Sequence, residues 1–175
     1  MRLKKGREAI IKKIENLIRG GISITWAIVF IYSWAVFIIF ADRSRLGSTA
    51  CGGFIALALG SVVDWAGHRL NLYQFNDSGI PWHLISFFYV AGPLFTMGTL
   101  FFQYISRNRL LQAANIIIFS LAYLSVELLL VMSGGATYIS WHFLASLLVD
   151  LIVFTAFSYV GEIIVYGKTG IKTGL

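Results

Sequence analysis

Four of the eight acidic residues in this chain lie inside long apolar stretches of the sequence, namely Asp64, Glu127, Asp150 and Glu162. An ionised side chain near the centre of a membrane-spanning helix costs about 2.5–3.5 kcal/mol on insertion scales, so each of these carboxyl groups needs a proton or a polar partner. Carboxyl groups in such positions commonly mark the binding site or the path of a cation, a proton or a small polar solute. These residues are therefore the first candidates for function.

Further polar side chains are expected near Asp64 and Glu127. His68 follows Asp64 by one helical turn, so a hydrogen bond between the two side chains can form within one helix. Tyrosine, tryptophan and histidine also occur just beyond the apolar stretch that contains Glu127. We predict one ligand-binding or polar cluster in the half of the membrane nearest the N-terminus, formed by Asp64, His68, Glu127, Tyr138, Trp141 and His142.

Asp150 stands deep in the last apolar stretch, where neither headgroups nor bulk water reach it. Ser146, one turn earlier, offers a single hydroxyl and is a weak partner for a full charge. The sequence predicts that Asp150 carries a proton at neutral pH or bonds to another helix, through Asn115, Ser120 or Thr96. Its expected role is proton movement or helix association.

Three classes of function fit these residues. The first is binding or passage of a small polar solute, a cation or a proton. The second is an enzyme in which Asp64 and Glu127 perform acid–base chemistry on a lipid or isoprenoid headgroup. The third is a structural role, in which polar groups hold helices together. The chain has no G-x-S-x-G and no H-E-x-x-H motif, so we predict no catalytic residue, metal site or cofactor, and the balance favours a protein that is not an enzyme.

The composition is typical of membrane proteins. Apolar residues make up 58% of the 175 residues, aromatic residues 15%, and the mean hydropathy is +0.78. Five apolar runs, separated by loop-forming residues, are long enough to cross a bilayer. The runs cover residues 21–40, 47–67, 82–104, 111–132 and 138–165. We predict an all-α membrane protein with a five-helix transmembrane domain over 21–167 and a short polar tail over 168–175.

Residues 1–20 form a separate segment, which we expect to be an amphipathic basic helix. Its apolar face would enter the headgroup boundary and its lysines would face anionic lipid headgroups. The alternative is that these charges only fix the topology of the chain. The net charge of +6 does not point to nucleic acid, because the basic residues follow a membrane-facing helix without a base-stacking platform. Membrane lipids are the expected partners, and a pore would require a homo-oligomer.

The orientation depends on the basic residues of the N-terminal segment. Five spans would put Arg69 and the seven basic residues of the first 19 on one side, against six on the other side. Because the N-terminal segment crosses a membrane poorly, we place the N-terminus on the cytoplasmic side of the cell membrane. Four of the five tryptophans fall near that same surface and are expected to be interfacial anchors. They are Trp26, Trp65, Trp82 and Trp141.

Two local patterns predict how the apolar runs pack. Gly53, Gly60 and Gly67 recur every seven residues and give a groove that lets a neighbouring helix approach closely. Asp64 shares this glycine face and should therefore point into the bundle. Pro93 lies midway through the third run and should distort that helix.

Three segments resemble an uncharacterised family of small integral membrane proteins of spore-forming clostridia and bacilli. The segments are GSVVDWAGHRLNLYQF, IPWHLISFFYVAGPLFTMGTLFFQYISRNRL and SLAYLSVELLLVMSGGATYISWHF, within about residues 45–160. The resemblance implies a helical membrane protein with about five spans and no assigned activity. Asp150 and the basic N-terminal helix are not features of that family. The positions that match are Asp64, Pro81, Tyr89, Pro93, Glu127, Tyr138 and Trp141.

Overall fold

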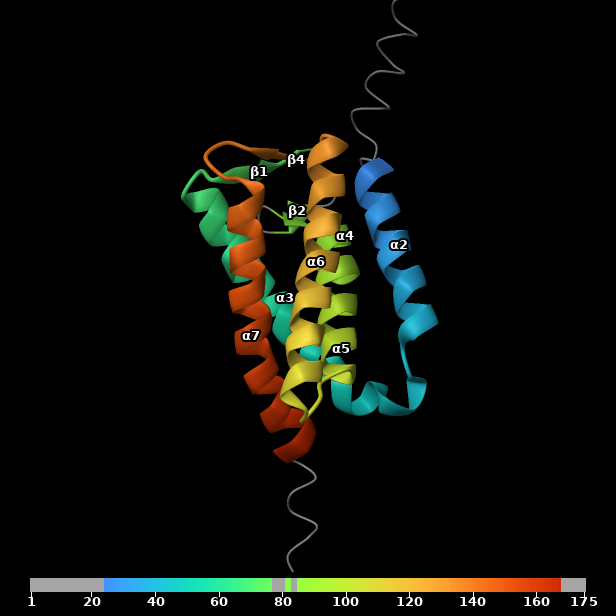
Figure 1. Cartoon of the computed structure of the whole chain (residues 1–175). Helices are drawn as coiled ribbons and strands as arrows, with labels where there is room; N and C mark the ends of the chain where they lie inside the picture. Colours follow the sequence, from blue (N-terminus) through green and yellow to red (C-terminus); the bar gives the residue numbers. More distant parts are fainter. Residues whose placement is uncertain (1–23, 77–80, 83–84, 168–175) are drawn as a thin grey trace, which may run out of the picture.

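The computed structural model describes residues 24–76, 81–82 and 85–167, and these residues are mostly helical. Figure 1 shows the helices side by side in one bundle. The predicted interfacial helix over 1–20 and the tail over 168–175 lie outside the described residues. The helices are α2 (Ile24–Phe40), α3 (Leu46–Arg69) after a short 3-10 turn η1 (Arg43–Arg45), the joined segments α4 (Phe87–Tyr89), η2 (Val90–Leu94) and α5 (Phe95–Gln103), then α6 (Arg109–Met132) and α7 (Phe143–Gly167).

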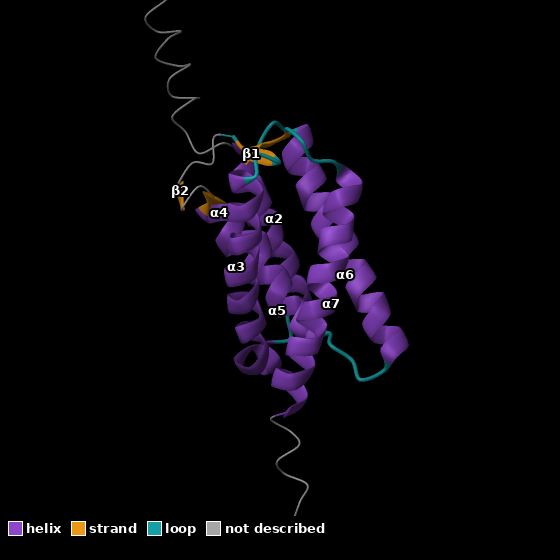
Figure 2. Cartoon of the chain, turned by 90° about the vertical axis from the view of Figure 1, so that its left-hand side faces the viewer, coloured by secondary structure: helices purple, strands orange, loops and turns teal. Residues whose placement is uncertain are grey.

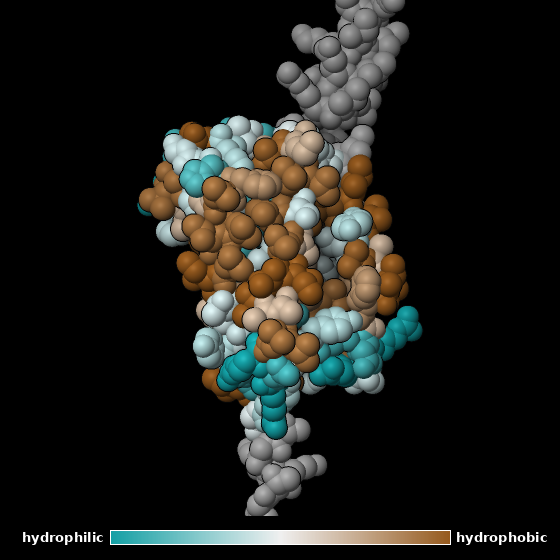
Figure 3. Space-filling model, viewed as in Figure 1, coloured by the Kyte–Doolittle hydropathy of each residue, from teal (hydrophilic) through white to brown (hydrophobic). Residues whose placement is uncertain are grey.

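Three of these helices are long and apolar enough to cross a membrane: Arg43–Arg69, Arg109–Met132 and Phe143–Gly167. Two more apolar helices, Thr25–Phe40 and Phe87–Gln103, are shorter. The prediction of a helical membrane protein is therefore confirmed at this level, and the helices fall on the five predicted apolar runs. In the view of Figure 3, hydrophobic side chains cover most of the middle of the bundle, and the most hydrophilic side chains gather at its lower end.

The all-α prediction needs one correction, because two short antiparallel strand pairs are present. Strand β1 (Tyr73–Phe75) pairs with β4 (Ala136–Tyr138), and Tyr73 lies opposite Tyr138. Strand β2 (Pro81–Trp82) pairs with β3 (Ile85–Ser86). Figures 1 and 2 show β1 and β4 lying across one end of the bundle. There the ladder satisfies backbone groups of two loops that would otherwise lack partners next to the apolar interior.

Helices α3 and α5 pack closely against each other, and glycines line their contact. A Cβ atom added to Gly52 would lie 2.7 Å from the backbone oxygen of Gly98. A Cβ atom on Gly60 would lie 2.5 Å from the side chain of Leu94 in η2. The predicted glycine groove of Gly53, Gly60 and Gly67 receives side chains, namely those of Thr99 and Phe95, Leu94 and Tyr73, whereas the close backbone approach occurs at Gly52, outside the predicted set.

The distortion expected at Pro93 takes the form of a π-helical turn over Val90–Leu94. Proline has no N–H to donate, and the helix continues because the Phe95 N–H reaches the carbonyl oxygens of Val90 and Gly92. Thr96 also donates its hydroxyl to the Gly92 oxygen at 2.8 Å. The wider turn places Leu94 against Gly60 of α3.

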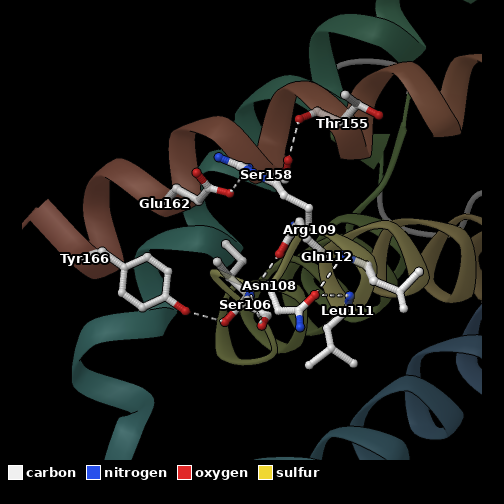
Figure 4. Close-up of polar contacts among 11 residues, drawn as sticks. Ser106, Asn108, Arg109, Leu111, Gln112, Thr155, Ser158, Glu162 and Tyr166 are labelled. Atoms are coloured by element: carbon white, nitrogen blue, oxygen red, sulfur yellow. Dashed lines mark hydrogen bonds and ion pairs between the residues drawn. The ribbon is translucent and has the colours of Figure 1, made fainter.

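Polar contacts join α6, α7 and the loop before α6 at the end of the bundle away from β1 and β4 (Figure 4). Arg109, exposed at the start of α6, forms an ion pair of 2.6 Å with Glu162 of α7. The Tyr166 hydroxyl donates to the backbone oxygen of Ile105 at 2.8 Å. Asn108 caps α6 by accepting a hydrogen bond from the backbone N–H of Leu110. Glu162 is thus held at the surface end of its helix.

The tryptophans divide into two kinds. Trp65 is exposed and the Arg69 guanidinium lies 5.6 Å from its ring centre, as expected of an interfacial anchor. Trp26, predicted to be an anchor, is instead 0% exposed and donates its indole N–H to the Asn76 oxygen at 3.0 Å. That backbone oxygen, supplied by the chain just after β1, gives the buried indole the partner it needs.

Candidate functional site

A cavity of about 310 Å³ lies inside the bundle, between α3, the segment from α4 to α5, α6 and α7. The ends of β1 and β4 also line it. Most of its wall is apolar, and its polar groups come from nine residues. They are Asp64, Tyr73, Tyr89, Tyr123, Glu127, Tyr138, Trp141, Ser146 and Asp150.

Asp64 lies near the end of α3 and is only 6% exposed. Its Oδ1 atom accepts a hydrogen bond of 2.8 Å from the Tyr73 hydroxyl, and its Oδ2 atom has no hydrogen-bonding partner among the described residues. Gly67 makes this geometry possible, because a Cβ atom there would lie 2.5 Å from the Tyr73 ring. Asp64, a residue of the cavity wall, therefore has one buried carboxyl oxygen that no described residue hydrogen-bonds.

His68 does not bond to the Asp64 carboxyl group as predicted. Its Nδ1 atom is 2.8 Å from the backbone oxygen of Asp64, and its Nε2 atom accepts from the Phe75 N–H at 3.2 Å. These two bonds require the neutral tautomer with the proton on Nδ1. His68 fixes the turn from α3 into β1, and it is not among the residues that line the cavity.

Glu127 lies near the end of α6 and collects two hydrogen bonds. Its Oε1 atom accepts from the Tyr138 hydroxyl and from the Ser146 hydroxyl, each at 2.7 Å. Trp141 donates its indole N–H to the Ser146 oxygen, also at 2.7 Å. Three predicted cluster residues, Glu127, Tyr138 and Trp141, are thus brought together. The link between Trp141 and Glu127 is Ser146, which the sequence analysis considered only as a weak partner of Asp150.

Asp64 and Glu127 occupy equivalent positions in their helices and have equivalent tyrosine partners. Each carboxyl residue stands five residues before the end of a 24-residue helix. Each bonds to a tyrosine of the strand that follows its own helix, and those tyrosines face each other across the β1–β4 ladder. The strand pair therefore sets the spacing of the two carboxyl groups.

Burial is the main reason why the pKa of Tyr73 and of Tyr138 lies above the usual phenol value. The charge of Asp64 raises the pKa of Tyr73 further, and the hydrogen bond to Glu127 raises that of Tyr138. Both hydroxyl groups therefore remain donors over the whole neutral range. They are fixed hydrogen-bonding partners of the two carboxyl groups.

Asp150 lies on α7 with 8% exposure and lines the same cavity. No hydrogen bond reaches its carboxyl group from any residue that the structure describes, and its Oδ2 atom is fully buried. Of the predicted partners, Asn115 donates to the Phe101 oxygen at 3.5 Å and Thr96 bonds within its own helix, while the buried Ser120 hydroxyl has no hydrogen-bonding partner among the described residues. The predicted bond to another helix is therefore wrong. Protonation of Asp150 stays a prediction.

Tyr89 and Tyr123 complete the polar part of the wall, and the sequence analysis did not place them in the site. Their hydroxyl groups are hydrogen-bonded to each other between α4 and α6. One signal was available for Tyr123, which precedes Glu127 by one helical turn and so shares its face.

Two other sequence candidates, His142 and Glu162, are not among the residues that line the cavity. His142 is exposed, and its Nδ1 atom accepts from the Ala145 N–H at the start of α7. Glu162 is paired with Arg109 at the far end of the bundle. Within the described ranges, no three His, Cys, Asp or Glu side chains are close enough to hold a metal ion.

The cavity is closed towards the Glu162 end and open towards one side. Below Asp150, a cluster of Phe101, Phe102, Phe154 and Phe157 fills the bundle. The only exposed residues among those that line the cavity are Leu59, Val63 and Leu70, all at α3. Because α3 and α7 touch little, this exposed edge faces the surroundings of the bundle, which in a membrane is lipid.

No model of a known protein family matches the chain, and the searches of curated proteins and of solved structures also gave no match. The resemblance to small membrane proteins of spore-forming bacteria stays a prediction.

Proposed function

We propose that this chain is a multi-pass cell-membrane protein that binds a small amphiphilic molecule inside its bundle. The apolar part of the ligand would occupy the wall formed by α3, α5 and α7. Its polar end would meet Asp64, Glu127 and Asp150. The observation that carries the proposal is one apolar cavity of about 310 Å³ whose wall contains all three carboxyl groups. This volume is at the lower end of the range for small-molecule sites.

Binding fits the geometry better than conduction through the protein. A path for ions or protons would continue from Asp150 towards Glu162. That direction is filled by Phe101, Phe102 and Phe157, while Glu162 is engaged with Arg109. The open edge at α3 instead suits entry from the lipid phase.

The second candidate is an enzyme acting on a lipid or isoprenoid headgroup, and the one-sided pocket favours it as well. Two carboxyl groups in one cavity are the minimum for acid–base chemistry. Glu127, however, already accepts two hydrogen bonds, and the described residues of the cavity wall include neither a histidine nor a cysteine. Binding without chemistry therefore remains the proposed function.

The topology belongs to the same proposal. We take the five helices as five spans, with α2 and the helix from α4 to α5 crossing despite their shorter length. The end that carries β1, β4 and the carboxyl groups would face the cytoplasm together with the N-terminus. Lipid headgroups remain the expected partners of residues 1–20, and homo-oligomerisation stays a prediction.

Ligand binding in the cavity can be tested by introducing a larger side chain that would block it. Val153 lines the cavity on α7, and Val160 lies on the same helix outside it. Purified protein in lipid nanodiscs is incubated with decylamine and with decanol, and bound molecules are counted by equilibrium dialysis against empty nanodiscs. We expect saturable binding of one molecule per chain, lost in Val153→Phe and kept in Val160→Phe. Equal binding to both variants, or no binding above empty nanodiscs, would contradict the proposal.

A further inference from the structure

The hydrogen-bonding groups of the cavity are unbalanced, with free acceptors and almost no free donors. Asp64 Oδ2 and Asp150 Oδ2 are buried and have no partner within the described part of the chain. Both residues line the cavity and are more than nine-tenths buried. Burying such an oxygen without a hydrogen bond is costly, so these two atoms indicate a donor that the cavity receives from outside.

The donors of the wall are already used. Tyr73 donates to Asp64, and Tyr138 and Ser146 donate to Glu127. Trp141 donates to Ser146, and the paired hydroxyl groups of Tyr89 and Tyr123 leave only one proton between them. None of the described Arg or His residues lines the cavity. A ligand that needs several donors, such as a phosphate or a carboxylate, would meet mainly acceptor oxygens in this wall.

We infer that the ligand of this cavity is an organic amine, whose protonated nitrogen lies between Asp64 and Asp150 and whose apolar body lies along α3 and α7. This inference rests on the proposed function and names the class of its ligand. An alkylammonium group offers three N–H donors and a positive charge, which match two free carboxyl oxygens. An alcohol offers a single donor without charge. A quaternary ammonium offers charge without any donor.

The test compares three probes of equal chain length, namely decylamine, decanol and decyltrimethylammonium. Each is dialysed against the full chain in nanodiscs and against empty nanodiscs, so that partition into lipid is subtracted. We expect the unaltered chain to bind decylamine at least tenfold more tightly than either other probe, because hydrogen bonds to charged groups are the strong ones. Comparable affinity for decanol or for the trimethylammonium probe would overturn the amine inference.

Substitutions of single carboxyl groups test which residues give the preference for the amine probe. Asp64→Asn and Asp150→Asn should each weaken decylamine binding about tenfold or more and leave decanol binding nearly unchanged. Asp42→Asn, at an exposed acid outside the cavity, is the matched control and should change neither. Unchanged decylamine affinity in both cavity variants would contradict the inference. Because the probe preference is measured on the unaltered chain, the test stands even if a variant does not fold.

The outcomes separate the two proposals. If decylamine and decanol bind equally and Val153→Phe abolishes both, the cavity binds amphiphiles but does not select amines. If no probe binds above empty nanodiscs, the proposed function fails together with the inference.

Discussion

At one end of the bundle, two tyrosine hydroxyl groups donate hydrogen bonds to carboxyl groups, Tyr73 to Asp64 and Tyr138 to Glu127. The two carboxyl groups differ in how many hydrogen bonds they accept. Among the described residues, Asp64 has Tyr73 as its only side-chain hydrogen-bonding partner, whereas Glu127 accepts from Tyr138 and from Ser146. Removing one donor therefore leaves Asp64 without any bond but leaves Glu127 with one. The cost of an unpartnered polar group in an apolar interior makes this difference measurable.

Tyr73→Phe should lower the free energy of unfolding by about 1–3 kcal/mol, since it removes the only partner of a buried carboxyl group. Tyr138→Phe should cost less, because Ser146 remains. Tyr159→Phe, at an exposed position of α7, should have almost no effect. The free energies can be measured by detergent-induced unfolding in mixed micelles. A larger loss for Tyr138→Phe than for Tyr73→Phe would contradict the hydrogen-bond assignment.

Alkaline pH should destabilise the fold through the same two tyrosines. An unfolded chain releases phenolic protons near pH 10, whereas the raised pKa of Tyr73 and of Tyr138 keeps those protons bound in the folded protein. The unfolded state then binds fewer protons, so stability is complete below about pH 10 and falls as the pH rises further. Unfolding midpoints measured against pH should decline less steeply in the double variant Tyr73→Phe, Tyr138→Phe. An identical slope would show that these phenols do not control the decline.

At the scale of elements, the packing of α3 against η2 and α5 shapes the cavity. Leu94 of η2 and Met97 of α5 line it together with residues of α6 and α7. Gly52→Ala should destabilise the protein by about 1–3 kcal/mol, since the added Cβ would lie 2.7 Å from the backbone oxygen of Gly98, which cannot turn away. Gly47→Ala, at a helical position with nothing within 4 Å, should be neutral or stabilising by up to about 1 kcal/mol. Thermal unfolding of both variants checks this. Equal effects would show that the helices do not touch at Gly52.

The positions of the helices could be predicted from the sequence, whereas the strand pairing and the hydrogen bonds between helices and loops could not. Long apolar runs and the residues between them indicate where helices begin and end, and Pro93 marks the place of the π turn. Three-residue strands such as β1 and β4 give no periodic signal, and their pairing joins segments far apart in the sequence. The burial of Trp26 depends on an oxygen of Asn76, which only the folded loop supplies. The absent partner of Asp150 likewise depends on how α7 is turned.

At the scale of the whole molecule, the orientation can be tested at the two ends of α6. Asn108 caps the first turn of this helix, and Asn76 bonds to the Gly134 oxygen just beyond its last turn. In a Cys51→Ala background, a cysteine at position 76 should be shielded from an impermeant thiol reagent in intact cells, and one at position 108 should react. The reverse pattern would place the carboxyl groups at the outer face and show that the arginines near α3 and α6 decide the topology.

The most direct test of the binding site is a distance between ligand and protein within the membrane. Decylamine labelled with ¹⁵N is bound to protein labelled with ¹³C at its aspartate carboxyl groups, and dipolar contacts are recorded by solid-state NMR in lipid. We predict contacts from the amine nitrogen to the carboxyl carbons of Asp64 and Asp150, assigned by the loss of one signal in Asp64→Asn and of the other in Asp150→Asn. Contacts that persist in both variants, or an amine nitrogen close to lipid phosphates alone, would contradict a ligand site inside the bundle.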